Sequence, residues 1–539
     1  IIVIGMFRKD KYMNNVLLKM QTAHTENGAL SYATTGSACL DYWSKCGTLG
    51  GRSQDLVNAD MERIFAEDEN AALKIVFGMR LITRKPDSEE VGDDISTGYG
   101  RRDEFYKAVV WMHSNRKEML YRNLHSIPMF GSWKDFLNEP LIDVLDRNAV
   151  FKVMLDAAVC NQVENGSWSL PDLLCKYLPQ IRSEKNIRSD RDRKRVIWAK
   201  DFCKHFKLSP KEYRQLKSSG SAHTWQKQMG HNEWDKINFD GIPGKAMLLH
   251  TSQTGKDKKT VFERHDLVPR MIDWLKEQKT VKFTGYPYEL TKAAAKNPSL
   301  VQKLTYDRQF ESLLETMKGH SLGNTLACLD TSGSMQYESV AGVSAYDVCI
   351  SMGLVFSALN VGDFKDSVVA FDESSRLIRL NGTFCERLNQ IRSMTTAWGS
   401  TNFQSVIDLL VRIRETNPNI PISEYPETLI VISDMQFNPV RGNSSTNYEE
   451  AMKKLRSVGL NDVRIIWWQV NGRTTDFPSQ MNDKGVYMIG GFDPTNIKAL
   501  MGLTQSGENA NFDSKEKKEQ DPMDGMRNFL SQPIFQLVR

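Results

Sequence analysis

The chain has 539 residues, of which 40% are hydrophobic, and this length and composition predict a soluble, globular protein with two or more domains. The net charge is only +4, and no apolar stretch approaches the length that a membrane-spanning helix requires. An integral membrane protein is therefore excluded.

The eight cysteines are scattered along the sequence and form no C-x-x-C pair, and no histidine lies beside them at the spacing of a zinc site. This pattern argues against a structural zinc site and against a disulfide framework. We expect buried free thiols, because an unpaired cysteine usually behaves as a small apolar residue. A reducing, cytoplasmic location fits this expectation.

The charge is divided unevenly along the chain. Residues 1–320 carry 50 basic and 41 acidic side chains, whereas residues 321–539 carry 20 basic and 25 acidic ones. The first part therefore has a net charge of +9 and the second part a net charge of −5. This asymmetry predicts that a polyanionic partner would bind to the first part.

Residues 55–160 show repeated helical patterns. In DLVNADMERIFAEDENAALKIVFGMRLITR, which begins at Asp55, apolar residues recur three and four positions apart behind an acidic first turn. A second such segment follows the glycine-rich STGYG, and a third begins at IPMF. Successive helix pairs of this length predict a HEAT-like α-solenoid, although the sequence contains no strict repeat.

Residues 182–217 are rich in lysine and arginine, and aromatic residues are interleaved at positions 198, 202, 206 and 213. One interpretation is a solvated helix face, which is the usual meaning of a run of charge. The other is an RNA-binding surface, where basic side chains neutralise phosphates and aromatic rings stack on bases. The sequence leaves both open. The candidate RNA-binding residues are Arg191, Arg193, Lys194 and Arg195, followed by Arg80, Arg101 and Arg102.

After residue 320 the pattern changes to short strands that alternate with helices. The expected strands are NTLACLD, DSVVAFD, SRLIRL, TLIVISD, VRIIWWQV and GVYMIGG, most of which are rich in valine and isoleucine. Amphipathic helices such as AYDVCISMGLVFSALN and NYEEAMKKLRSVG lie between most of them. This alternation predicts a doubly wound, mostly parallel sheet, so the whole chain is expected to be of the α + α/β class.

Polar loops adjoin the predicted strands and helices of this second part. Asp330 ends one strand and opens the sequence D-x-S-x-S, which also contains Ser332 and Ser334. Thr401 precedes a predicted helix, and Asp434 ends another strand. Ligands of open α/β sheets bind beyond the carboxyl ends of the strands, so we expect these five side chains to meet there. Two carboxylates and three hydroxyls form a set of oxygen ligands suited to Mg²⁺ or Mn²⁺.

Other chemistries fit the sequence less well. An aspartic protease needs the motif Asp-Thr-Gly in two copies. Here the glycine, Gly333, comes one position too late, and no second copy occurs. No complete P-loop occurs, and all nine histidines lie at or before His320, so no Ser-His-Asp set is indicated. A simpler alternative is that the D-x-S-x-S loop only caps a helix. The sequence favours a metal site and predicts no enzyme.

The D-x-S-x-S loop, Thr401 and Asp434 resemble the metal-ion-dependent adhesion site of von Willebrand factor A domains. In the first part, ENGALSYATTGSACLDYW, ALKIVFGMRLITR, STGYGRRDEFYKAVVWM and LHSIPMFGSWKDFL resemble in order the helical TROVE module of the Ro ribonucleoprotein autoantigens. YRQLKSSGSAHTWQKQM, EWDKINFDGIPGKAM and SDMQF extend the likeness over roughly residues 25–500. The chain looks most similar to uncharacterised relatives of that family in plants, fungi and large DNA viruses.

One element of the family, Gly-Lys-Gly-Glu-Arg, is only partly preserved. Gly98, Gly100 and Arg102 match it, whereas Tyr99 replaces the lysine and Arg101 replaces the glutamate. A role of that lysine or glutamate therefore does not carry over. The resemblance implies a ring or solenoid of helices closed by the A domain, in which the helical part binds small structured RNAs and RNA ends.

Two functions follow from these patterns. The first is a non-enzymatic, ribonucleoprotein-type protein that binds structured or single-stranded RNA, while its A-like domain uses Mg²⁺ or Mn²⁺ to bind an acidic residue of a protein partner. The second is a structural or scaffold protein, for example a virion component, that uses the metal site without RNA. Both assume a helical TROVE-like domain in residues 1–320, an A-like domain in residues 321–510, and a tail in residues 511–539 that returns to the helical domain or is disordered.

Overall fold

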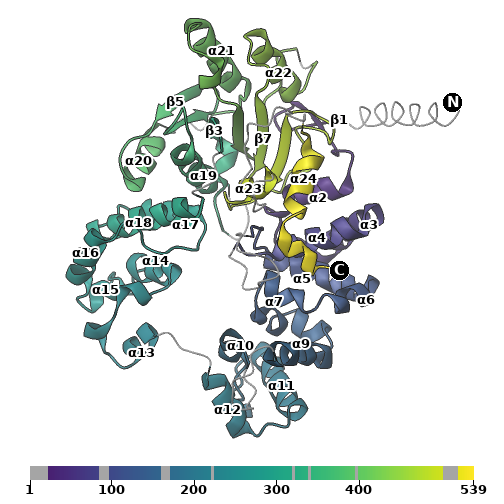
Figure 1. Cartoon of the computed structure of the whole chain (residues 1–539), viewed down its shortest axis with the longest axis vertical. Coiled ribbons are helices and arrows are strands. Elements are labelled where there is room, and N and C mark those ends of the chain that lie inside the picture. The colour runs from purple at the N-terminus through teal and green to yellow at the C-terminus, as the bar shows by residue number, and fades with distance from the viewer. Residues whose placement is uncertain are drawn as a thin grey trace, which may run out of the picture. The chain divides into compact units, whose positions relative to one another are not determined.

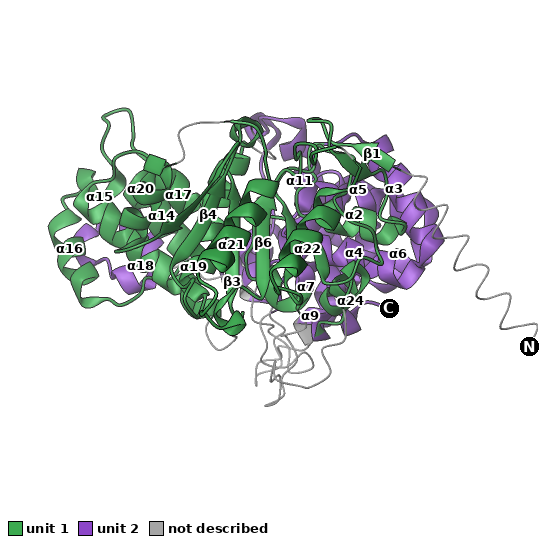
Figure 2. Ribbon diagram, turned by 90° about the horizontal axis from the view of Figure 1, so that it is seen from above, with its two compact units in different colours: residues 1–51, 242–532 green, residues 52–241, 533–539 purple. Residues whose placement is uncertain are grey.

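The computed structural model describes residues 22–83, 96–159, 170–219, 224–317, 322–337, 342–394, 399–442, 444–501 and 520–539. Contacts within the chain divide it into two compact units, which Figure 2 colours separately. Unit 1 contains residues 1–51 and 242–532, and unit 2 contains residues 52–241 and 533–539. The change from helices to alternating strands near residue 320 lies inside unit 1, and the domain boundary predicted there stays a prediction.

Within the described part of the chain, unit 1 contains a six-stranded sheet with the strand order β5-β4-β3-β6-β7-β8. Its strands are β3 (Thr325–Asp330), β4 (Ser367–Phe371), β5 (Ser375–Arg379), β6 (Thr428–Ser433), β7 (Arg464–Gln469) and β8 (Val486–Gly490). Neighbouring strands are parallel except β4 and β5, which are antiparallel. These are the strands that the sequence predicts, and the predicted α + α/β class is confirmed.

The helices of unit 1 cover this sheet and extend beside it (Figure 1). They are α2 (Ala38–Cys46), α14 (Gly244–Ser252), α15 (Val261–Arg264), α16 (Val268–Glu277), α17 (Pro287–Ala294), α18 (Leu300–Met317), α19 (Ala345–Leu359), α20 (Phe384–Met394), α21 (Gln404–Thr416), α22 (Asn447–Ser457), α23 (Asn496–Leu500) and α24 (Pro522–Leu530). Short 3-10 helices are η6 (Gly333–Gln336) and η7 (Ile422–Glu424).

The centre of the sheet forms the core of unit 1. β3, β4 and β6 are buried along their whole length, as expected for parallel strands that helices cover. The apolar helix α19 packs on β3 and β4. A Cβ at Gly353 would lie 2.5 Å from the side chain of Leu329, so a larger residue there would push α19 away from β3.

Residues from near both ends of the chain meet at β8. The helices α2 and α24 pack on β8 and on each other, and Figure 1 shows them side by side. The rings of Trp43 and Phe529 meet edge to face with their centroids 5.6 Å apart. Ahead of α2, β1 (Thr22–His24) and β2 (Leu30–Tyr32) form a hairpin, and Tyr32 forms a β-bridge with Phe477. Residues 22–51 therefore belong to the sheet-containing unit by direct contact.

Unit 2 is helical. Its elements are α3 (Gln54–Glu67), α4 (Glu69–Arg80), α5 (Arg102–Asn115), α6 (Lys117–Arg122), α7 (Ser126–Phe130), η2 (Trp133–Leu137), α8 (Leu141–Val144), α9 (Arg147–Val159), α10 (Asp172–Tyr177), η3 (Glu184–Asn186), α11 (Asp190–His205), α12 (Pro210–Ser219), α13 (Thr224–Gly230), η4 (Trp234–Lys236), η5 (Phe239–Gly241) and η8 (Pro533–Leu537). α3, α4 and α5 pack against one another, α9 packs on α11, and α10 packs on α12. The pattern that begins at Asp55 forms two helices because the side chain of Asp68 accepts bonds from the first amides of α4.

The last residues of the chain bind to the helices of unit 2. The Ser126 hydroxyl donates to the carbonyl of Leu537 at 3.0 Å, and the amide of Arg539 donates to the side chain of Asn123 at 2.7 Å. The rings of Phe130 and Phe535 lie 5.5 Å apart. Residues 533–539 thus complete the packing of α6 and α7.

Two predictions from composition can be compared with the described residues. None of the described helices combines the length and the apolar character needed to cross a membrane. The cysteines in the described part of the chain are free and buried, as predicted, and Cys160 lies outside the described residues.

Candidate functional site

The carboxyl ends of β3 and β6 bring the two predicted carboxylate ligands to one edge of the sheet. The strands are parallel neighbours, with Leu329 opposite Ile432, so the residues that follow leave the sheet on the same side. Asp330 ends β3 and is fully buried, and Asp434 follows β6 and is 2% exposed. Two carboxylates are therefore held close together away from water.

Hydroxyl groups surround this pair. The backbone amide of Ser332 donates to Asp330 Oδ1 at 2.9 Å, and the Ser433 hydroxyl donates to Asp330 Oδ2 at 2.5 Å. The hydroxyls of Ser332 and Ser334 lie 3.2 Å apart. The Ser334 hydroxyl in turn makes a hydrogen bond to the carboxyl of Asp434 that lowers the pKa of that carboxyl. The D-x-S-x-S loop thus joins both carboxylates through side-chain and backbone contacts.

The loop of Thr401 is tied to the same edge. The amide of Gly333 donates to the carbonyl of Gly399 at 3.1 Å, and the amide of Asn438 donates to the carbonyl of Thr401 at 2.8 Å. Thr401 itself is 1% exposed. All five predicted ligands, Asp330, Ser332, Ser334, Thr401 and Asp434, therefore lie on three loops that are bonded to one another.

The electrostatics of this edge disfavour two negative charges. Burial raises the pKa of Asp330, and the nearby charge of Asp434 raises it further. Burial also raises the pKa of Asp434, to which the charges of Glu26 and Asp476 add. A cation between the two carboxyls would remove the repulsion and stabilise both ionised forms.

The residues present fit a hard divalent cation. Among the described residues, no group of three or more His, Cys, Asp or Glu side chains could hold a metal, so a site here depends on two carboxylates and several hydroxyls. Mg²⁺ accepts this kind of set because it binds one or two carboxylates and keeps several waters. A softer metal such as Zn²⁺ would lack its preferred nitrogen and sulfur ligands.

A part of the site that the sequence did not predict is the turn between β1 and β2. Within this turn, the Thr25 hydroxyl donates to the carbonyl of Phe437 at 2.7 Å, and the amide of Glu26 donates to Gln436 Oε1 at 2.5 Å. The side chain of Asn27 donates to the carbonyl of Gln436 at 2.5 Å and to Thr401 Oγ1 at 3.4 Å. Asn-Gly in the turn is a hairpin signal, but nothing in the sequence indicates its contact with loops about 400 residues away.

One predicted RNA-binding residue has a structural role instead. Arg80 is 2% exposed, and its guanidinium donates to both oxygens of Asp135 at 3.0 and 3.1 Å. Asp135 also accepts from the hydroxyl of Tyr106 at 2.6 Å. The guanidinium is enclosed and satisfied inside unit 2, so the prediction that Arg80 contacts RNA is corrected.

The two arginines ahead of α5 differ in exposure. Arg101 is mostly buried, and its guanidinium lies 4.0 Å from the carboxylate of Asp103. Arg102 is exposed, and its charge adds to the effect of burial in lowering the pKa of Lys134. Of this pair, Arg102 is the one accessible to a polyanion.

The four basic candidates on α11 have different environments. Arg193 is exposed, and Arg191 donates to the side chain of Asn138 at 3.1 Å. Lys194 lies 3.1 Å from Glu139 and 2.8 Å from Asp143, so acidic side chains already neutralise it. Arg195 is half-buried, and its Nε is enclosed without a hydrogen-bond partner in the described part of the chain.

The aromatic residues of the basic stretch form the core of the helices around α11. Trp198, Phe202 and Tyr213 are at most 1% exposed. Phe151 of α9 meets the rings of Trp198 and Phe202 edge to face at 5.1 and 5.4 Å. These rings cannot stack on bases while the core is intact, so that part of the RNA-surface interpretation is wrong. The four-residue spacing of Trp198 and Phe202 along α11 was the signal of a buried helix face.

Comparisons with known proteins return two family models of unknown function. A domain of unknown function (DUF2828) matches residues 25–166, and another domain of unknown function (DUF7788) matches residues 324–532. The second match runs from just before β3 to just beyond α24 and includes the loops of all five predicted metal ligands.

Two individual proteins are similar to the chain. Uncharacterized protein L728 of Acanthamoeba polyphaga mimivirus is 23% identical over 525 residues, which cover 89% of this chain and 85% of the viral protein. The crystal structure of the Ro (RSR) protein of Deinococcus radiodurans is 10% identical with a TM-score of 0.33, and the match covers 82% of this chain and 91% of that one. The function of this chain is therefore inferred from its own residues.

Proposed function

We propose that this chain is a non-enzymatic, ribonucleoprotein-type RNA-binding protein whose sheet holds Mg²⁺ or Mn²⁺ for contact with a protein partner. The observation that supports RNA binding is the crowding of basic side chains in unit 2. Burial lowers the pKa of Lys134, and the charges of Arg102, Lys176 and Arg195 lower it further. Cations that repel one another in this way attract a polyanion.

The metal half of the proposal is supported by the convergence of the three loops at the sheet edge. Asp330 and Asp434 would hold the ion directly or through water, together with the hydroxyls of Ser332, Ser334 and Thr401. A bound divalent ion supplies a positive centre with an open position for a carboxylate of a partner. The turn that contains Glu26 lies against these loops, so a partner would have to compete with this segment for space.

Salt-dependent filter binding with a structured RNA tests the RNA half. Replacing Arg102, Lys134 and Arg195 together by glutamine should weaken binding and flatten the plot of log affinity against log salt by about 0.9 for each lost phosphate contact. The matched control replaces Lys256, Lys258 and Lys259, which are exposed on unit 1, and should keep the wild-type slope. If no salt-dependent binding occurs at low ionic strength, the RNA proposal fails.

A scaffold that binds protein but not RNA is the second candidate. Two observations favour it: Lys194 is already paired with acidic side chains, and Trp198, Phe202 and Tyr213 of the basic stretch are buried. The two candidates differ in what copurifies with the chain. A scaffold should retain its partner after nuclease treatment and release it when EDTA removes the metal, and Asp434→Asn should release it without EDTA.

A further inference from the structure

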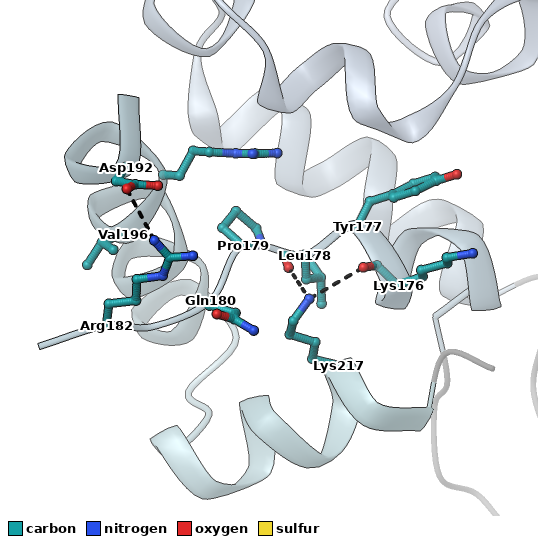
Figure 3. Close-up of a pocket in the computed structure, with 10 residues that line it drawn as sticks. Lys176, Tyr177, Leu178, Pro179, Gln180, Arg182, Asp192, Val196 and Lys217 are labelled. Carbon is teal, nitrogen blue, oxygen red and sulfur yellow. Dashed lines mark hydrogen bonds and ion pairs between the residues drawn. The ribbon is translucent and has the colours of Figure 1, made fainter. Parts of the chain in front are cut away.

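Unit 2 contains a pocket of about 320 Å³ formed by residues of α10, α11, α12 and the segment after α10 (Figure 3). Four of the residues that line it are basic, and one is acidic. The basic residues are Lys176, Arg182, Arg195 and Lys217, and the acidic residue is Asp192. A pocket with this imbalance is suited to an anion.

The wall of the pocket is fixed by α12. The hydroxyl of the buried Tyr213 donates to the carbonyl of Pro179 at 2.7 Å. The ammonium of Lys217 donates to the carbonyl of Leu178 at 2.6 Å and lies 3.4 Å from the carbonyl of Lys176, as Figure 3 shows. An ammonium has three N–H donors, so this arrangement leaves one for a ligand.

The acidic side chain of the pocket is already engaged. Asp192 pairs with Arg182 at 3.1 Å. Arg195 has its Nε buried without a hydrogen-bond partner in the described part of the chain, which costs free energy for a charged donor. Burial lowers the pKa of Arg195, and the charges of Arg191 and Arg182 lower it further. Burial also lowers the pKa of Lys217, and the charge of Arg195 adds to this effect. An anion in the pocket would relieve this repulsion.

We propose that this pocket binds a phosphate monoester, carried by the end of an RNA or by a free nucleotide, and that Arg182, Arg195 and Lys217 hold it. A volume of about 320 Å³ is at the lower limit of small-molecule sites, roughly 300–1,000 Å³, and accommodates one nucleotide rather than a duplex. The side chain of Gln180 lies between Arg182 and Lys217 in Figure 3, where its amide can bond to the nucleoside. The RNA-end form of this proposal rests on the proposed RNA binding and specifies which part of the RNA is recognised.

The test measures binding of the full chain to three probes by isothermal titration calorimetry. The probes are a single-stranded RNA with a terminal phosphate, the same RNA with hydroxyls at both ends, and a nucleoside monophosphate. We expect the phosphorylated RNA to bind at least tenfold more tightly than the hydroxyl form. Arg195→Gln should abolish this preference, and Arg182→Gln provides a second variant at another position of the pocket. Lys200→Gln, an exposed change on the same helix, should leave the preference intact.

The outcomes separate this proposal from RNA binding itself. If the two RNAs bind equally and the nucleotide does not bind, the pocket proposal fails while RNA binding stands. If the nucleotide binds and neither RNA does, the RNA-end source and the proposed function both fail, and a free nucleotide remains as the ligand. If the preference for phosphate survives Arg195→Gln and Arg182→Gln in folded protein, the phosphate is held elsewhere and the pocket proposal is overturned.

Discussion

Unit 1 contains a cluster of acidic side chains and unit 2 a cluster of basic ones, and the two clusters are held in place differently. At the sheet edge of unit 1, Asp330 and Asp434 are buried together, and their pKa values are raised. In unit 2, the half-buried Arg195 and Lys217 lie near the exposed Lys134, and the pKa values of all three are lowered. In both places the fold holds charges that repel, and a counter-ion would turn that repulsion into binding energy.

The difference lies in how the two clusters are assembled. The carboxylates are held by backbone amides and hydroxyls of three short loops at the ends of buried strands, so their positions follow from the sheet. The cations extend from several helices over a shared core and have long, flexible side chains. The first cluster is therefore suited to one small ion with fixed geometry, and the second to a larger anion whose position can vary.

The largest expected effect comes from the core beneath the basic cluster. Phe202→Ala should destabilise the protein by about 3–5 kcal/mol, because it empties space beside Trp198 and Phe151. Thermal or urea unfolding followed by circular dichroism measures this loss. Ile197→Ala, at an exposed position of the same helix, is the control and should change stability little. A Phe202→Ala protein of normal stability that fails only to bind RNA would restore the base-stacking interpretation.

The second effect concerns the acidic cluster. Mg²⁺ at a hundredfold excess over its dissociation constant should stabilise the folded protein by about 2.7 kcal/mol. Asp330→Asn should abolish this gain yet remain folded without metal, because it removes one of two buried like charges. Asp307→Asn, which changes a carboxyl on α18 that accepts from the amide of Cys385, should keep the response to Mg²⁺. An unchanged Mg²⁺ response in Asp330→Asn would place the ion elsewhere.

The strands of the sheet and the loops of the five candidate metal ligands could be predicted because local sequence patterns mark them. Each strand is a short apolar run, and Asp330, Ser332 and Ser334 lie within one loop. Parallel pairing of β3 and β6 then brings Asp434 beside them, because the ends of parallel strands leave the sheet at the same edge. The metal-ligand set itself stays a prediction until an ion is observed.

The features that could not be predicted depend on contacts between segments far apart in the sequence, which no local pattern indicates. Arg80 at the end of α4 reads as an exposed basic residue until its partner Asp135, 55 positions away, is seen. The pocket joins residues of α10, α11 and α12, and the turn of Glu26 and Asn27 reaches loops beyond residue 400. The four-residue spacing of the aromatic residues on α11 indicates a buried face, but the many charged residues of the same segment suggest an exposed helix.

A smaller effect is expected from the turn beside the acidic cluster. Glu26→Gln should weaken Mg²⁺ binding by about two- to fivefold, because it removes a negative charge that acts on Asp434 but is itself exposed to water. A Mg²⁺ titration monitored by thermal unfolding measures the change. Glu69→Gln, an exposed carboxylate on unit 2, is the control. Loss of binding as complete as in Asp330→Asn would instead identify Glu26 as a ligand of the ion.

The smallest expected effect tests the basic cluster through pH. The pKa of Lys217 is lowered, so as pH rises this ammonium loses its proton earlier than an ordinary lysine would. A phosphate monoester is already a dianion above its second pKa of about 6, so its own charge stays constant between about pH 7 and 9. Affinity for a nucleoside monophosphate should therefore decline slightly as the pH rises toward the titration of Lys217, because the neutral amine no longer attracts the phosphate.

Substitution of the residue separates this titration from other causes. Lys217→Arg keeps its charge throughout the range because a guanidinium does not lose its proton there, so the decline with pH should disappear. Lys200→Arg makes the same chemical change at an exposed site on α11 and should retain the wild-type decline. If Lys217→Arg and the wild type lose affinity in parallel, the titrating group is another cation of the cluster, and Lys134, whose pKa is also lowered, is the next to replace. Mg²⁺ binding at the acidic cluster should change in the opposite direction, because a higher pH favours the ionised carboxylates that bind the cation. Opposite pH responses of Mg²⁺ and nucleotide binding in one protein would show that the two clusters act independently.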